Sequence, residues 1–215
     1  MNENQKFCRI CSRKAATRFF EESNRLYWCC KICAAVFVDK THLPGAEEEL
    51  RHYLEHENDP DDMKYRQFLN KLAGPLLKRM PAGLKGLDYG CGPGPALALI
   101  LEEAGHRVHL YDPFFFPSTD VLNQKFDFIV CTETAEHFHF PWKEFERLDR
   151  LLRQGGRLGI MTTFLVDGKD FPAWYYRRDP THVVFYRRKT FHALARIFGW
   201  RCEIPADNVV IMHKL

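Results

Sequence analysis

Apolar residues recur at helical spacing in two segments before position 82. One face of each segment would be apolar, formed by Leu50, Tyr53 and Leu54 in the first and by Phe68, Leu69, Leu72 and Leu76 in the second. The polar segment NDPDD at 58–62 separates them and offers capping residues for the second helix. We therefore expect two helices here, with Tyr53 and His56 as candidates to reach a ligand from a lid.

Beyond position 82, strand-like and helix-like segments alternate. The segments 86–90, 96–105 and 106–112 have the pattern of a strand, a helix and a second strand. The same alternation continues with a strand at 126–132, a helix at 141–156, a strand at 157–163, a helix at 189–200 and a hairpin over 200–215. Such alternation predicts an α/β fold with a parallel sheet and right-handed crossovers.

Length and composition set the scale of the protein. A chain of 215 residues holds one ordinary domain and a small appendage. Apolar residues make up 46% and charged residues 27%, as in globular proteins with a core. The net charge of +3 is too small to indicate nucleic acid by itself.

The chain has eight cysteines and no apolar run of membrane-spanning length. Its first residues, MNENQKFCRI, lack the apolar stretch of a secretion signal. We therefore expect a cytoplasmic location, where cysteines serve as thiols or metal ligands more often than as disulfides.

Four of the cysteines form two C-x2-C pairs separated by 18 residues, namely Cys8 with Cys11 and Cys30 with Cys33. This spacing predicts a tetrahedral zinc site of structural type, since four thiolates leave no open coordination position. Cys29 is a second choice in place of Cys30. We expect a zinc-ribbon-like unit over 1–42, a helical bridge or cap over 43–82, and the main domain over 83–215.

A glycine-rich turn follows the first strand of the main domain. It contains Gly90, Gly92 and Gly94, and Pro95 stands where the dinucleotide fingerprint requires glycine or alanine. A cofactor without pyrophosphate still needs the tight turn, but not the full fingerprint. Asp112 lies 22 residues beyond Gly90, where a carboxylate can accept hydrogen bonds from ribose hydroxyls.

The segment LDYGCGPG and the acid that ends the second strand resemble the class I S-adenosylmethionine-dependent methyltransferases. The resemblance covers roughly 86–215 and implies a doubly wound, Rossmann-like sheet of seven strands. It implies S-adenosylmethionine as cofactor, bound near Asp88, Gly90, Cys91, Gly92, Gly94, Asp112, Pro113 and Thr132. Only 13 residues separate Asp112 from Phe126, so the family's third strand and its helix must be abbreviated here.

The stretch CTETAEHF follows the strand at 126–132 and contains Glu133, Glu136 and His137. Neighbouring carboxylates repel each other unless a cation, a proton or hydrogen-bond donors intervene. With the distant His182, this E-x-x-E-H set resembles the metal-dependent small-RNA 3′-end 2′-O-methyltransferases, and E-x-x-E-H itself also resembles the ubiquinone-pathway O-methyltransferases. The resemblance implies that Glu133, Glu136, His137 and His182 bind a divalent cation such as Mg²⁺ or Mn²⁺.

A second interpretation of the same residues needs no metal. Many methyltransferases of this fold have a Glu-His pair here that caps a helix or orders the loop. In that case His182 and Tyr186 are the candidate general bases.

Aromatic residues and arginines are mixed in the segment after position 170. They are Trp174, Tyr175, Tyr176, Phe185 and Tyr186, with Arg177, Arg178, Arg187 and Arg188. We expect Phe185 to pack inside and Trp174 and Tyr175 to lie in a lid over the acceptor.

These features predict methyl transfer to a hydroxyl of a small metabolite, assisted by a cation if the Glu/His set binds one. Methylation of a carbon or nitrogen atom of a small molecule stays open. The alternative is a ribose 2′-O RNA methyltransferase that grips RNA with the zinc ribbon and the lid. A third hypothesis is a non-enzymatic protein with a vestigial glycine turn and a docking ribbon. Fold alone does not name the acceptor.

Overall fold

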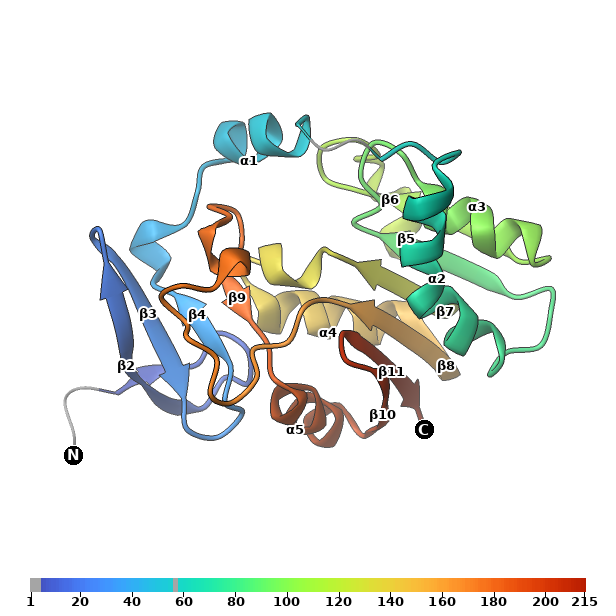
Figure 1. Ribbon diagram of the computed structural model, residues 1–215. Helices are drawn as coiled ribbons and strands as arrows, with labels where there is room; N and C mark the ends of the chain where they lie inside the picture. The colour runs from blue at the N-terminus through green and yellow to red at the C-terminus, as the bar shows by residue number, and fades with distance from the viewer. Residues whose placement is uncertain (1–4, 56–57) are drawn as a thin grey trace.

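The computed structural model describes residues 5–55 and 58–215, which form two β-sheets with helices around the larger one (Figure 1). His56 lies outside the described residues. The strands are β1 (Lys6–Phe7), β2 (Lys14–Glu22), β3 (Arg25–Cys30), β4 (Val36–Val38), β5 (Lys85–Tyr89), β6 (Arg107–Tyr111), β7 (Phe126–Thr132), β8 (Leu152–Met161), β9 (Val184–Phe185), β10 (Trp200–Ala206) and β11 (Val209–Lys214). The helices are α1 (Ala46–Tyr53), α2 (Met63–Leu77), α3 (Ala96–Glu103), α4 (Pro141–Leu151) and α5 (Arg188–Phe198), with 3₁₀ turns η1 (Lys40–His42), η2 (Thr119–Asn123), η3 (Ala135–His137) and η4 (Tyr175–Arg178).

The larger sheet has the strand order β10-β11-β8-β7-β5-β6. Its three parallel pairings follow from the sequence pattern: β5 pairs with β6 and β7, and β7 pairs with β8. The closing hairpin of β10 and β11 joins β8 in antiparallel fashion. The predicted α/β fold is therefore confirmed.

Apolar residues of the helices cover both faces of this sheet. On one face, Leu72 of α2, Leu101 of α3 and Phe128 of β7 belong to one core. On the other face, Phe145 of α4 and Phe191 of α5 belong to the larger core. The sheet is thus doubly wound, and its strand ends are left free between the two layers to form a binding site.

The sheet contains six strands rather than the seven that the family resemblance implies. Within the described residues, the segment 113–125 contains the 3₁₀ turn η2 and an isolated bridge from Phe116 to Asp112, but no strand. Thirteen residues are too few for a helix and a strand with their connections. As a consequence, β6 is an edge strand of the sheet.

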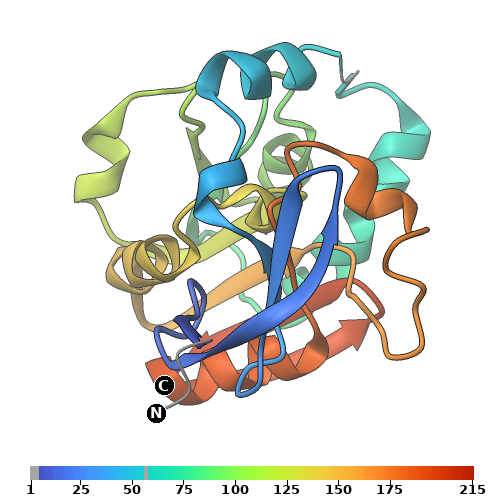
Figure 2. The same cartoon turned by 90° about the vertical axis from the view of Figure 1, so that its left-hand side faces the viewer.

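The smaller sheet is built mainly from the N-terminal segment and has the order β1-β2-β3-β4-β9. Its last strand comes from far along the chain, since Val36 of β4 pairs with Phe185 of β9. One continuous core runs from the four cysteines to α4 and α5, and Figure 2 shows the small sheet in front of the larger one. The division into 1–42, 43–82 and 83–215 stays a prediction.

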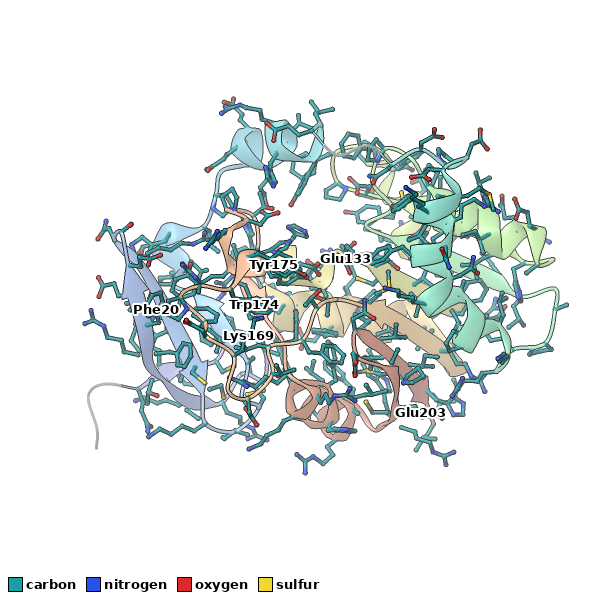
Figure 3. The ribbon with its side chains drawn as sticks, in the orientation of Figure 1. Phe20, Glu133, Lys169, Trp174, Tyr175 and Glu203 are labelled. Atoms are coloured by element: carbon teal, nitrogen blue, oxygen red, sulfur yellow. The ribbon has the colours of Figure 1, made fainter. Side chains whose placement is uncertain are left out.

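Several local expectations hold. Helix α2 begins after Asp62, whose side chain accepts a hydrogen bond from the amide of Lys64 at 2.8 Å. Phe185 is fully buried, as expected. Trp174 is not an exposed lid residue: only 3% of it is accessible, because it packs on Phe171 and Phe185, while Tyr175 is exposed (Figure 3).

Over the parts of the chain that the structure describes, no helix is both long and apolar enough to span a membrane.

Candidate active site

The carboxyl ends of β5, β6 and β7 meet at one edge of the larger sheet, because these strands are parallel neighbours. A cavity of about 660 Å³ opens at this edge. Its lining includes the glycine loop after β5, the residues after β6 and β7, and Glu49 and Tyr53 of α1. Open α/β sheets bind ligands at this edge, so the cavity is the candidate active site.

The glycines of the loop are required by its shape. Gly90 and Gly92 have φ values of +78° and +64°, which L side chains rarely adopt. A Cβ atom on Gly90 would lie 2.1 Å from Cγ2 of Thr134. A Cβ atom on Gly94 would lie 1.9 Å from the carbonyl oxygen of Asn58. The loop is therefore packed closely between the segment after β7 and the segment before α2.

The carboxylate of Asp112 is buried and fastens this loop to the end of β6. Its Oδ2 accepts a hydrogen bond from the amide of Gly92 at 3.0 Å. Its Oδ1 accepts hydrogen bonds from the amides of Phe114 and Phe115. Asp112 thus holds the cavity floor in shape through backbone amides, in addition to the predicted ribose contact.

Asp88 lies behind the loop rather than in the cavity lining. Its carboxyl is 3% exposed, and burial, with a smaller contribution from Asp112, raises its pKa to about 7. Of the predicted cofactor-binding residues, six line the cavity: Gly90, Cys91, Gly92, Asp112, Pro113 and Thr132. Asp88 and Gly94 do not.

Three of the four residues that were predicted to bind a metal lie close together in the structure. Ligand atoms of Glu136, His137 and His182 all lie within 4.8 Å of one another. Glu136 is fully buried, and its Oε1 accepts a hydrogen bond from the Tyr176 hydroxyl at 2.5 Å. Its Oε2 is shielded from solvent and has no hydrogen-bond partner among the described residues.

The two imidazoles are held by backbone carbonyl oxygens. Nδ1 of His137 lies 3.1 Å from the oxygen of Thr181, and Nδ1 of His182 lies 2.7 Å from that of Tyr176. A carbonyl only accepts, so each Nδ1 carries a proton, and Nε2 is the nitrogen of each ring that could bind a cation. Burial also lowers the pKa of His137 and favours its neutral form. Metal-binding histidines are oriented in this way.

Glu133 is not a member of this group of three. It lines the cavity beside the glycine loop instead. Burial raises the pKa of its carboxyl to about 9, and the charge of Glu136 adds to this effect while Lys71 opposes it. Glu133 is thus close enough to Glu136 for their charges to interact, but it is not among the three residues whose ligand atoms converge.

A family comparison agrees with this arrangement of glycine loop, acid and strand ends. Residues 50–203, more than half of the chain, match the family model described as a methyltransferase domain. The chain belongs to the methyltransferase domain family. This match confirms the prediction, made from the sequence, of a class I S-adenosylmethionine-dependent methyltransferase enzyme.

Solved structures show the same fold as this methyltransferase. The chain is similar to 1,6-didemethyltoxoflavin-N1-methyltransferase from Burkholderia thailandensis with bound 1,6-didemethyltoxoflavin and S-adenosylhomocysteine. The two share 16% identity and a TM-score of 0.54, and the match covers 92% of this chain and 98% of that one. It is also similar to magnesium protoporphyrin IX methyltransferase from Synechocystis PCC 6803 with bound S-adenosylhomocysteine, with 14% identity, a TM-score of 0.50, and coverage of 79% and 94%. No curated protein sequence matches the chain.

Tyr186 lies away from the cavity of the methyltransferase. It is fully buried, and its hydroxyl donates to the carbonyl oxygen of Ala135 at 2.9 Å. This geometry supports an anchoring function for Tyr186, which holds the turn η3, and offers it no route to an acceptor as a general base.

Two contributors to the site were not among the predicted site residues. Tyr176 donates a hydrogen bond to Glu136. Asp179 lines the cavity, and its Oδ2 lies 3.0 Å from Nε2 of His52 and 3.6 Å from Nε2 of His182. Asp179 precedes His182 by three residues, and this acid-to-histidine spacing was the available signal. Tyr53, expected in a lid, lines the cavity with its ring against His137 at 5.3 Å.

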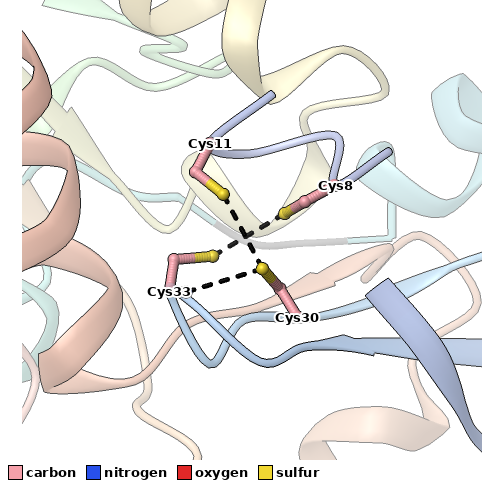
Figure 4. A group of neighbouring side chains, drawn as sticks. All are labelled: Cys8, Cys11, Cys30 and Cys33. Carbon is pink, nitrogen blue, oxygen red and sulfur yellow. Dashed lines mark hydrogen bonds between the residues drawn. The ribbon is translucent and has the colours of Figure 1, made fainter. Parts of the chain in front are cut away.

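The four cysteines of the methyltransferase converge, as their spacing predicts (Figure 4). Sγ of Cys8 lies 3.6 Å from that of Cys33, and Sγ of Cys11 lies 3.7 Å from that of Cys30. All four are buried. These four sulfurs suit a closed tetrahedral site. Cys29 is only partly buried and is not in the group.

Proposed function

We propose that the enzyme transfers the methyl group of S-adenosylmethionine to a hydroxyl of a small-molecule acceptor, at a divalent cation held by Glu136, His137 and His182. One observation carries the proposal. Glu136 is fully buried, and one oxygen of its carboxylate has no partner among the described residues. This carboxylate lies beside two imidazoles whose Nδ1 atoms already face backbone carbonyl oxygens.

The glycine loop supports the binding of the cofactor. The close backbone turn at Gly90 and Gly92 leaves room for a ligand, and Asp112 lies where a ribose is bound in this kind of fold. S-adenosylmethionine supplies a methyl group on a positively charged sulfur, which makes the carbon electrophilic. The loop and the strand ends would orient this methyl toward the acceptor, a positioning effect worth up to about 7–11 kcal/mol.

The donor set fits a transition-metal ion. One carboxylate and two imidazoles favour Mn²⁺, Fe²⁺ or Zn²⁺ over Mg²⁺, which prefers oxygen ligands. A buried carboxylate oxygen without a partner, such as Oε2 of Glu136, is also costly, and a cation would remove that cost. When bound, such an ion lowers the pKa of a hydroxyl that it touches. Tyr176 would keep the carboxylate of Glu136 oriented toward it.

A small-molecule acceptor is favoured over RNA. Three of the four lid arginines are engaged in ion pairs: Arg177 with Glu22, Arg187 with Asp167 and Arg188 with Asp207. The similar structures named above belong to enzymes named for small molecules, 1,6-didemethyltoxoflavin and magnesium protoporphyrin IX. The cavity lining also includes Tyr53, Phe114 and Phe138, which suit an acceptor with an aromatic or apolar part.

Zinc at the four cysteines completes the proposal. The site would be structural, because its four sulfurs are buried and no coordination position would remain for an acceptor. It would hold together the two turns that carry the cysteines, at the end of the small sheet.

Metal analysis with a matched variant tests the proposal. We expect the purified enzyme to contain one zinc that resists mild chelation, and to bind one labile Mn²⁺ whose removal abolishes methyl transfer to hydroxylated acceptors. Glu136→Gln should lose the labile ion and the turnover while it keeps its affinity for S-adenosylhomocysteine. Full turnover in the chelated enzyme, or in Glu136→Gln, would refute the role of the cation.

A further inference from the structure

Glu133, the residue that directly follows β7, has an unusual backbone conformation. Its φ is +47°, in the left-handed region that non-glycine residues rarely adopt. Its amide donates to the carbonyl oxygen of Met161 at 2.8 Å, which holds this conformation at the end of β7. Strained residues of this kind cluster at ligand-binding sites, so the conformation raises the question of what the side chain binds.

The side chain of Glu133 leaves one oxygen without a partner. Its Oε1 is shielded from solvent and accepts no hydrogen bond from the residues that the structure describes. The residue lies in the interior between the small sheet and α2 in the view of Figure 3. A carboxylate in this position is stable only with a proton or a cationic partner.

Glu133 lies beside the glycine loop, in the cavity that His137 and His182 also line. Thr134 links the two segments, since its hydroxyl donates to the carbonyl oxygen of Gly90 at 3.0 Å. Glu133, Gly90 and Gly92 line the same cavity, together with Tyr65 and Phe68 of α2. Ligand atoms near Glu133 would therefore belong to the molecule that the glycine loop binds.

We propose that Glu133 binds the α-ammonium group in the methionine part of S-adenosylmethionine, and is not a metal ligand. This assignment rests on the proposed function. The cofactor has two cationic centres, a sulfonium and an ammonium, but only the ammonium has N–H groups that can donate to an unpartnered carboxylate oxygen. An adjacent ammonium also favours the ionised form of the carboxyl.

The assignment predicts a distinctive pattern of affinities. S-adenosylmethionine and S-adenosylhomocysteine both have the ammonium, whereas 5′-methylthioadenosine has the same nucleoside without the amino-acid part. Loss of one charge-assisted hydrogen bond weakens binding by about 10–100-fold. Glu133→Gln should therefore lose this much affinity for the first two compounds and keep that for 5′-methylthioadenosine within about 2-fold.

Isothermal titration calorimetry on the full-length enzyme and on Glu133→Gln, with these three compounds, tests the assignment. Equal weakening for all three compounds, or no weakening for any, would overturn it. Binding of none of them by the unmodified enzyme would instead refute the proposed cofactor site, and this assignment with it.

A titration with Mn²⁺ separates Glu133 from the metal site. Glu133→Gln should bind the ion as the unmodified enzyme does, whereas the matched variant Glu136→Gln should not. Loss of Mn²⁺ binding in Glu133→Gln would return this residue to the metal ligands and reject the ammonium contact. Circular dichroism of both variants verifies that each is folded.

Discussion

The guanidinium of Arg25 donates to the backbone carbonyl oxygen of His182, at 3.1 Å, across 157 positions of sequence. The same Nη2 atom donates to the carbonyl oxygen of Pro180 at 2.8 Å. Arg25 begins β3 of the small sheet, and His182 lies in the candidate active site. The small sheet is therefore attached directly to the segment that carries one of the proposed metal ligands.

Arg25→Ala should impair turnover more than cofactor binding. Removal of the guanidinium leaves the carbonyl groups of Pro180 and His182 without this donor and frees the loop to move. We expect kcat to fall by about 10-fold and the affinity for S-adenosylhomocysteine to stay within about 3-fold. Arg201→Ala, at an exposed site on β10, is the control and should retain both. An equal loss of affinity and kcat in Arg25→Ala would argue against a positioning function.

Tyr176→Phe should weaken metal binding. Its hydroxyl is the hydrogen-bond donor to Oε1 of Glu136, and loss of such an outer contact costs about 10–100-fold in metal affinity. Mn²⁺ affinity measured by calorimetry is the readout. Tyr175→Phe changes the exposed neighbour in the same way and should have no effect. Unchanged Mn²⁺ affinity in Tyr176→Phe would contradict the proposed site.

Cys11→Ser should remove the zinc and destabilise the protein. Zinc in a four-thiolate site contributes directly to folding free energy, so loss of one ligand should lower the Tm by more than about 10 °C. Cys29→Ser, next to a ligand but outside the group, should keep both the zinc and the Tm. Differential scanning calorimetry and elemental analysis report the two quantities. Retention of one zinc by Cys11→Ser would show that the ligand set is different.

Gly90→Ala should disrupt the cofactor loop. Alanine at φ +78° is strained, and its Cβ would lie 2.1 Å from Thr134. Gly168→Ala has almost the same φ, +75°, and no atom within 4 Å of its Cβ, so it shares the strain without the clash. We expect a cost of about 1 kcal/mol for Gly168→Ala and at least ~2 kcal/mol for Gly90→Ala, by urea unfolding. Equal costs would show that the close packing on Thr134 is unimportant.

The stability of the cofactor-free enzyme should depend on the ionisation of Asp88. Burial raises its pKa to about 7, whereas the unfolded chain releases this proton near pH 4. Between these values the folded state binds more protons, so the free energy of unfolding should decrease as the pH rises from about 4 to about 7. Asp88→Asn should remove this decrease and be more stable at pH 7 by about 1–3 kcal/mol.

Urea unfolding across this pH range measures the effect. Asp120→Asn, at an exposed position, is the control and should retain the dependence of the unmodified protein. The same slope in Asp88→Asn as in the unmodified protein would place the responsible group elsewhere.

The sequence by itself determined the elements of this protein and the outline of its site. Helical and strand periods, the cap at Asp62 and the glycine turn are local properties, because each depends on residues a few positions apart. The convergence of Cys8, Cys11, Cys30 and Cys33 was also predictable, since the two short turns leave few other arrangements. The strand alternation placed Asp112 and Thr132 at the same sheet edge as Gly90.

Only the tertiary structure decided how distant segments meet. The pairing of Val36 with Phe185, the bond from Tyr176 to Glu136 and the burial of Trp174 each join elements that no local pattern relates. That Glu136, His137 and His182 converge without Glu133 follows only from the structure, and a motif does not encode the left-handed backbone of Glu133. These contacts form only when the two sheets and their helices pack into one core. Burial then favours one set of contacts among those that the local sequence allows.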